Sequence, residues 1–344
     1  MKIAIDGMGG DFGPRPIVEG VVQVLEEVAE FHPFLVGDEE VLKELLPNRY
    51  HNRVTFVHAS DAIGMDENGA NAPRRKESSI YKAIQLLREG EVEGVVSAGH
   101  SGATMSVATL RLGRIKGIKR PAIVTFMPNR KGSYTLVLDV GANVDCEPDH
   151  LYQFGIMGGI YGKVVLGKGE IKIGLLSNGE EEGKGNRATK EAHRLLKKVP
   201  GFIGNVEGGD VFTGEVDVVV CDGFVGNIFL KTSEGAGEAV AHFLKEEIER
   251  GGILVKLGAL LMRPAFRALK KRIDYAEYGG APLLGVNGCV IISHGKSNAK
   301  AIKNGIKQAI TYIRNDVTAK IATAIEQING EVSLPQPERG AEAS

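Results

Sequence analysis

The sequence predicts an α/β protein with an open, mostly parallel sheet covered by helices on both faces. Short apolar, β-branched runs alternate with amphipathic helical stretches, a pattern typical of parallel strands joined by crossover helices. The run 216–221 is apolar at almost every position, as a strand buried on both faces should be. A turn signal at 129–132 separates two strand-like runs and predicts an antiparallel hairpin within the sheet.

The elements follow one another in chain order. Strands are expected at 2–6, 33–36, 53–57, 92–98, 121–127, 134–140, 171–177, 216–221 and 289–293. Helices are expected at 16–30, 38–46, 77–89, 101–116, 148–164, 186–198, 224–249 and 297–328.

Length and charge limit the classes of protein that this chain can be. Its 344 residues include 42 Lys plus Arg and 43 Asp plus Glu, for a formal net charge of −1. A general nucleic-acid binder needs a basic excess to neutralise phosphates, so that class is not expected. We expect one two-lobed catalytic unit over 1–330. The stretch 331–344, with two prolines and small polar residues, is expected to be a flexible tail.

Cysteine usage and the N-terminus indicate a cytoplasmic protein. Cys146, Cys221 and Cys289 are odd in number and far apart, which favours buried thiols in a reducing compartment. Asp6 stands where a signal peptide would need apolar residues, and no run reaches the roughly 18 apolar residues of a membrane span. The sequence has no Cys/His cluster or acidic calcium-loop pattern, so we expect no bound metal.

Glycine-rich loops follow several strands, and ligands of open α/β sheets bind at the carboxyl ends of strands. The first loop, 6–13, is not a dinucleotide fingerprint, because Phe12 stands at the third glycine position. Asp6 and Asp11 are candidates to orient a substrate, and a tight turn with a capping aspartate explains them equally well.

The second loop joins a strand to a helix through small residues: Gly99, His100, Ser101 and Gly102. Free backbone N–H groups at such a helix entrance favour an anion site. A serine nucleophile elbow is the rival interpretation, but Ala103 replaces the final glycine of that motif. The third interpretation is an ordinary turn that binds no ligand.

Two further loops carry a candidate catalytic amine and amide. Lys184 lies between two glycines at a helix entrance, and Gly185 stands where a nucleotide-hydrolysing loop needs Ser or Thr. The lysine can reach a phosphate or a polarised carbonyl, unless it belongs to an exposed acidic loop. Asp222, just before a helix, is a candidate substrate-binding residue or simply the N-cap, and Asn227 in the first turn of that helix can donate to an oxyanion.

A basic amphipathic stretch lies at 251–273. At 100° per residue, Lys256, Arg263, Arg267 and Lys270 gather on one face, and Leu254, Leu257 and Leu261 gather on the opposite one. Pro264 would kink or split this helix. Such a stretch can lie on an anionic membrane surface or dock an acidic partner, and the ordinary alternative is a surface helix packed on its own core.

Together these motifs resemble the PlsX family, the bacterial acyl-acyl-carrier-protein:phosphate acyltransferases of phospholipid synthesis. The resemblance runs from Met1 to about Gln327. It rests on five collinear segments, 6–11, 97–103, 183–186, 222–227 and 279–285. Any one of them alone is weak, but five in order are specific.

The resemblance implies a fold like that of phosphate acetyltransferases and isocitrate-type dehydrogenases. It implies transfer of the acyl group of an acyl-carrier-protein thioester to inorganic phosphate, with no cofactor. It also implies a homodimer that visits the membrane, where an integral-membrane glycerol-3-phosphate acyltransferase uses the acyl phosphate.

The motifs fit this chemistry as a hypothesis. The amides after Gly99, with Ser101, hold phosphate, and Lys184 and Asn227 stabilise the charge that develops on the thioester oxygen. Arg263, Arg267 and Lys270 receive the acidic carrier protein while the leucine face touches lipid. The general base stays open between Asp6, Asp11 and His100.

Two other functions stay open at this point. One is a nicotinamide-dependent hydroxyacid dehydrogenase of the same fold, although the dinucleotide fingerprint is absent. The other is a non-catalytic scaffold that presents the 251–273 segment at a lipid surface, which leaves the glycine loops unexplained.

Overall fold

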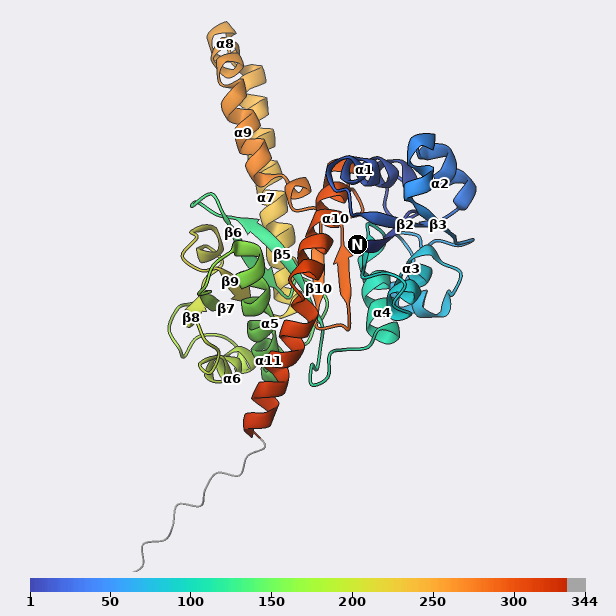
Figure 1. The fold of residues 1–344 in the computed structure, drawn as a ribbon. Helices are drawn as coiled ribbons and strands as arrows, with labels where there is room; N and C mark the ends of the chain where they lie inside the picture. Colours follow the sequence, from blue (N-terminus) through green and yellow to red (C-terminus); the bar gives the residue numbers. More distant parts are fainter. Residues whose placement is uncertain (333–344) are drawn as a thin grey trace, which may run out of the picture.

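A computed structural model of the protein describes residues 1–332, apart from the side chains of Lys270, Ile273, Tyr275 and residues 329–332. Within these described residues, eleven strands form one sheet (Figure 1). The strands are β1 (Lys2–Asp6), β2 (His32–Gly37), β3 (Thr55–His58), β4 (Gly94–Ser97), β5 (Ala122–Pro128), β6 (Tyr134–Leu138), β7 (Ile173–Leu176), β8 (Phe202–Val206), β9 (Val218–Val220), β10 (Ala281–Leu284) and β11 (Cys289–Ile292).

The sheet consists of two parallel blocks that run in opposite directions. Its order is β3-β2-β1-β4-β11-β10-β5-β6-β9-β7-β8. The first five strands are mutually parallel, as are the last four. Between the blocks, β10 pairs antiparallel with β11 and β5, and β5 pairs antiparallel with β6. Because of these three reversals, the carboxyl ends of the strands in one block lie at the opposite end of the sheet from the carboxyl ends of the strands in the other block.

Helices cover both faces, which confirms the predicted fold class. Successive side chains of a strand point to opposite faces, so Ile3 and Ile5 join one buried cluster and Ala4 the other. The first cluster packs under α1 (Pro14–Glu27), α2 (Glu39–Leu45), α5 (Pro148–Leu166), α6 (Arg187–Leu196), α10 (Ala299–Arg314) and α11 (Val317–Val332). The second packs under α3 (Ser79–Arg88), α4 (Ser101–Arg111) and the start of α7 (Gly223–Arg250).

The prediction missed two strands. β10 lies in the segment 279–285, where no strand was expected, and Pro282 within it cannot donate to a ladder. β8 carries Gly204 at a φ of 111° and forms the edge of the sheet, where packing constrains its sequence least.

The single helix expected at 297–328 is wrong, because the chain breaks between α10 and α11. Asp316 adopts a φ of 48°, outside the helical region, and α11 starts at the next residue. The tail expected over 331–344 begins inside α11, and residues 333–344 lie outside the described part of the chain.

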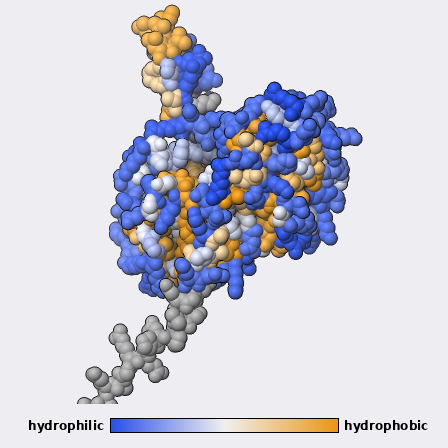
Figure 2. Space-filling model, in the orientation of Figure 1, coloured by the Kyte–Doolittle hydropathy of each residue, from blue (hydrophilic) through white to orange (hydrophobic). Residues whose placement is uncertain are grey.

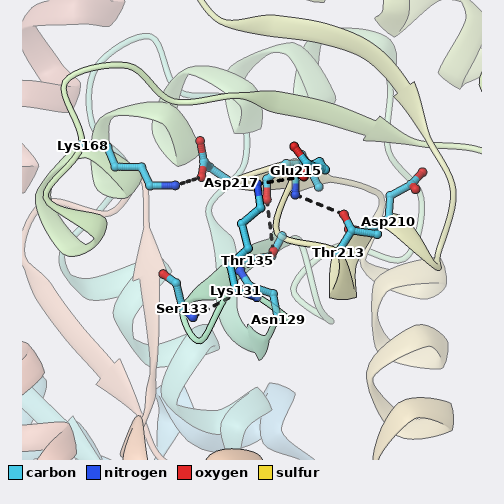
Figure 3. Close-up of polar contacts among 10 residues, drawn as sticks. Asn129, Lys131, Ser133, Thr135, Lys168, Asp210, Thr213, Glu215 and Asp217 are labelled. Atoms are coloured by element: carbon cyan, nitrogen blue, oxygen red, sulfur yellow. Dashed lines mark hydrogen bonds and ion pairs between the residues drawn. The ribbon is translucent and has the colours of Figure 1, made fainter.

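The β5–β6 hairpin is confirmed, and polar contacts join it to the segment before β9 (Figure 3). Thr135 donates through its hydroxyl to the Val216 carbonyl at 3.1 Å. Lys131 pairs with Glu215 at 2.8 Å. These contacts set the start of β9 against β6, and with it the loop that leads into α7.

Helices α7, α8 (Ile253–Leu261) and α9 (Arg263–Ile273) form an arm that projects from the body (Figure 1). The helix that we expected to kink or split does break, at Met262, just before Pro264. At the base of the arm, the Tyr278 ring stacks on Phe126 with centroids 5.6 Å apart. Figure 2 shows a hydrophobic tip on this arm.

Candidate functional site

The loops that follow β1, β4 and β11 pack against one another at one edge of the sheet. These strands are parallel neighbours, so their carboxyl ends lie together. A Cβ added at Gly9 would lie 2.5 Å from the Gly99 nitrogen, so only glycine permits this approach. The Asp11 amide donates to the Gly295 carbonyl at 2.8 Å. The fold thus gathers the predicted residues Asp6, Asp11 and Gly99.

Asp6 is buried, at 2% exposed, and links the first two loops. It accepts a hydrogen bond from the Ser97 hydroxyl at 2.7 Å, and Ser97 in turn accepts from the Gly99 amide at 3.1 Å. Burial raises the pKa of Asp6, against the lowering effect of hydrogen bonds from Ser79 and Ser97. Asp6 therefore supports the two loops from inside.

The N-terminus of α4 keeps two backbone donors for a ligand. The Gly99 amide is engaged by Ser97, and the His100 imidazole accepts from the Ala103 amide at 3.2 Å as the helix cap. For the amides of Ser101 and Gly102, the described part of the chain provides no acceptor. Within the described residues, no hydrogen bond joins the Ser101 hydroxyl to His100. The geometry suits anion binding better than an activated serine.

Asp139, which sequence analysis missed, organises the loop after β6. It is fully buried and accepts from the Ile123 amide (3.0 Å) and from the amides of Gly141, Ala142 and Asn143 (3.2, 2.9 and 2.7 Å). The Asn143 side chain adds a fifth bond at 2.9 Å. Burial raises the pKa of Asp139, and these donors oppose the rise. The sequence does contain a signal for this role, because Asp139, like Asp6, lies at the end of an apolar strand and close to a glycine.

Asp222 and Asn227 lie where α7 begins, against this loop. Asp222 caps the helix by accepting from the Val225 amide at 2.9 Å, which agrees with the N-cap alternative. The Gly223 amide donates to the Asn143 carbonyl at 2.8 Å, which fixes the helix start on the Asp139 loop. Asn227 is exposed, and a Cβ built on Gly141 would lie 3.8 Å from its amide carbon.

Lys184 lies in the exposed loop that follows β7. The loop is shaped by backbone caps, with the Gly185 amide donating to Asn178 at 2.8 Å and Asn186 capping α6. Because β7 and β9 are parallel neighbours, this loop leaves the sheet at the same edge as Asp222. Within the described part of the chain, the Lys184 ammonium has no ion pair, and no contact joins it to Asn227.

Helix α7 carries a charge that acts on the loop after β11. Burial lowers the pKa of His294 in that loop, and the Lys231 ammonium on α7 lowers it further. Lys231 comes four residues after Asn227, so both side chains lie on the same face of the helix.

The arm does not pack its leucines on the body. Leu254 is 80% exposed and Leu261 76%, and Leu257 is exposed as well, so the alternative of a helix facing its own core is wrong. Arg263 and Arg267 are exposed, whereas the Lys270 side chain lies outside the described residues. Of the helices in the described part of the chain, none has the length and apolar character needed to cross a membrane.

In the part of the chain that the structure describes, no group of three or more His, Cys, Asp or Glu side chains is placed so that it could hold a metal ion. The three cysteines are unpaired. Cys221 and Cys289 are buried and Cys146 is partly so, and burial raises the pKa of Cys146 to about 12.

The fold resembles solved structures of low sequence identity. A phosphotransacetylase from Streptococcus pyogenes superposes with a TM-score of 0.58 at 19% identity, covering 95% of this chain and 94% of that one. A structure described as a putative 4-hydroxythreonine-4-phosphate dehydrogenase from Salmonella typhimurium gives a TM-score of 0.50 at 16% identity, with 90% and 98% covered. Both confirm the expected kind of fold.

Sequence relatives are much closer. The phosphate acyltransferase of a Nitratiruptor species is 58% identical over 328 residues, which cover 95% of this chain and 98% of the relative. The model of the fatty acid synthesis protein family matches residues 1–320. The resemblance carried by the five loop segments is thereby confirmed, and the chain belongs to the fatty acid synthesis protein family.

Proposed function

We propose that this protein transfers the acyl group of an acyl-carrier-protein thioester to inorganic phosphate, and so makes acyl phosphate for membrane phospholipid synthesis. Family membership supports the coarser part of this function, an enzyme of acyl transfer that involves phosphate. The carrier protein as donor, acyl phosphate as product and the direct mechanism are our proposal.

Phosphate itself is the nucleophile in this reaction. An oxygen of hydrogen phosphate forms a bond to the thioester carbonyl carbon, the carbon–sulfur bond breaks, and the proton released by phosphate ends on the departing thiolate. No acyl-enzyme is needed, so the protein contributes mainly positioning and charge stabilisation. Ser101 and Gly102 offer two backbone donors to the phosphate, and Lys184 and Asn227 stabilise the oxyanion.

One observation carries the proposal: the free amides of Ser101 and Gly102 lie at a helix N-terminus whose loop is held rigidly by buried Asp6 and Ser97. Fixed donors that need no reorganisation are what stabilisation of an anion requires.

The test is a trapping assay. The protein is incubated with acyl-carrier thioester and phosphate, and acyl phosphate is captured with hydroxylamine as the hydroxamate. We expect hydroxamate only when phosphate is present, and a loss of about 100-fold in kcat for Asn227→Ala or Lys184→Ala. Lys190→Ala, an exposed lysine on α6, is the matched control. Full activity in both site variants, or a stable acylated protein competent for transfer, would contradict the mechanism.

The arm serves, in this proposal, as the contact with an anionic membrane and with the acidic carrier protein. Its apolar tip and its exposed basic residues Arg263 and Arg267 suit these partners. Val240 and Phe243 on α7, 66% and 61% exposed, are the surface proposed to pair in a homodimer. At the membrane, an integral acyltransferase would accept the acyl phosphate for transfer to glycerol 3-phosphate.

Vesicle flotation tests this use of the arm. We expect binding to vesicles with anionic lipid, weaker binding to neutral ones, and loss of binding in Leu254→Ser/Leu261→Ser, with catalysis in solution retained. Leu110→Ser, at a residue that is 69% exposed on α4, is the control for a generally less apolar surface. Equal binding by the arm variant and the control would remove the arm from the membrane contact.

A further inference from the structure

The segment between β3 and α3, residues 61–78, covers one side of the start of α4. It contains a short 3₁₀ helix, η2 (Gly69–Arg74), whose first residue is buried. A Cβ added at Gly69 would lie 2.6 Å from the Ala103 nitrogen and 3.0 Å from Cε1 of the His100 ring. Only glycine permits so close an approach. The backbone of the 61–78 segment therefore lies directly on the cap of α4.

The 61–78 segment also contacts the loop after β11. A Cβ added at Gly295 would lie 2.6 Å from the terminal methyl carbon of Met65. The two ends of the segment are tied together, because the Ser79 amide donates to the Asp61 carbonyl at 2.9 Å. The Ser79 side chain is in turn hydrogen-bonded to the buried Asp6. The segment is thus packed on the loops after β4 and β11 and linked to the end of β1.

Arg75 holds the 61–78 segment in its shape. Its Nε donates to the Asp61 carboxylate at 2.7 Å, and its Nη2 donates to the Ala62 carbonyl at 3.0 Å. Its Nη1 donates to the carboxylate of Glu67, which also accepts from the Gly64 amide at 2.7 Å. Because Glu67 precedes η2 and Arg75 follows it, the guanidinium joins the two ends of this short helix.

The contacts of Arg75 act on the segment more than on the whole fold. The Arg75 side chain is 32% exposed, and its partners Asp61 and Glu67 are 31% and 44% exposed. Ion pairs as exposed as these add little to the free energy of unfolding. A short 3₁₀ helix, however, has poor hydrogen-bond geometry of its own, so its position depends on what holds its ends. Loss of the guanidinium should therefore loosen Gly69 on α4 and leave the protein folded.

We propose that Arg75 is a positioning residue of the phosphate site: through Glu67 and η2 it holds Gly69 against α4, and so fixes the direction of the two free amides there. This inference rests on the proposed function and deepens it. Gly69 contacts Ala103 and His100, which flank those amides in the same helical turn. Donors that are fixed before the anion arrives bind it without a cost of reorganisation.

The experiment compares Arg75→Met and Arg75→Lys with Lys82→Met. Lys82 is the matched control, because it is 26% exposed and pairs at 2.7 Å with Glu77 of the same segment. Initial rates are measured against phosphate at saturating acyl carrier protein, and against acyl carrier protein at saturating phosphate. Displaced amides predict that Arg75→Met raises KM for phosphate about 10- to 100-fold, with KM for the carrier unchanged. Arg75→Lys keeps a cation beside the two carboxylates and should recover part of the loss.

Gly69→Ala tests the same contact with Arg75 in place, and it decides the question also where Arg75→Met fails to fold. Its methyl group would displace the first turn of α4, so we expect a similar rise in KM for phosphate. Gly169→Ala, in open space, is its control. If Arg75 acts through Gly69, the double variant should be no worse than the more affected single variant. A rise in only one single variant, or two rises that multiply, would overturn this route.

A second readout is independent of turnover: the rise in Tm on adding inorganic phosphate. We expect the full rise in the parent protein and in Lys82→Met, and a smaller one in Arg75→Met at the same phosphate concentration. A lower Tm in Arg75→Met with an unchanged KM and thermal shift for phosphate would reduce Arg75 to a structural residue and overturn its proposed role. A parent protein that binds phosphate but forms no acyl phosphate would instead overturn the proposed function, while the thermal shift still decides on Arg75.

Discussion

Two buried aspartates, one at the end of a strand in each parallel block, support the structure in different ways. Asp6, the last residue of β1, accepts a hydrogen bond from Ser97, which is 91 residues away in the chain, and so joins the ends of two strands. Asp139, after β6, accepts mostly from nearby residues that follow it and from β5. The first carboxylate holds two loops together, whereas the second shapes one loop and seats the start of α7 on it.

The difference shows why an aspartate at a strand end cannot be assigned a role from its position alone. Donors of Asp139 are mostly backbone groups that any sequence with the same fold would offer. Two donors of Asp6 are the hydroxyls of Ser79 and Ser97, so its role depends on side chains that are distant in the chain. Four changes separate these two kinds of support.

The largest effect is expected for Asp139→Ala. It leaves several buried N–H groups without an acceptor, and we expect a loss of about 3–5 kcal/mol in the free energy of unfolding. Urea denaturation measures it. Asp149→Ala, which removes an exposed partner of Lys119, should cost less than about 1 kcal/mol. Equal losses in the two variants would mean that the Asp139 contacts are not the support described here.

Asp6 is tested together with Ser97, because its support is a pair. We expect Asp6→Ala and Ser97→Ala each to cost about 1–3 kcal/mol, and the double variant to cost less than their sum by about 1 kcal/mol. A thermodynamic cycle from urea unfolding measures this coupling. Additive losses would show that the two loops are held by other contacts.

Glycine substitutions probe the same two loops through the backbone. Gly9→Ala places a Cβ against the Gly99 nitrogen, and Gly141→Ala puts a side chain at a φ of 140°. Each should cost about 1–3 kcal/mol, the first by a clash between loops and the second by local strain. Gly183→Ala, in open space, is the control and should be nearly neutral. Thermal unfolding of the three variants gives the comparison.

The smallest effect concerns pH. Both carboxyls have a pKa raised by burial, so the folded protein binds protons more readily than the unfolded one between pH 3.8 and the raised values. Their contribution to stability therefore falls as pH rises through this window. Asp6→Asn removes one of the two carboxyls. The free energy of unfolding of this variant should therefore fall less than that of the parent protein between pH 4 and pH 7. A pH-independent difference would contradict the raised pKa of Asp6.

Much of the fold could be predicted because its signals are local. The apolar residues of a run such as 2–6 or 216–221 are enough to predict a buried strand. The hairpin around Asn129 depends on a turn that is only a few residues long. Prediction failed where the local signal opposed the outcome. Pro282 and the neighbouring glycines give β10 a weak local strand signal, and its pairing with β5 and β11 makes it a strand.

The candidate site divides in the same way. Loops with glycines and caps, at Gly99, Lys184 and Asp222, were found from their own residues. The support from Asp139 and the use of the Gly99 amide by Ser97 were not, because each depends on packing that the local sequence does not encode.

By itself the sequence determined the fold class, the membership of a family and the loops at the strand ends, since all of these follow from short patterns of residue type. Tertiary structure alone decided that the two parallel blocks run in opposite directions and that the start of α7 rests on the Asp139 loop. The reason is physical: reversals of β10 and β5 depend on pairing between distant strands, and only the packed sheet determines which ends meet.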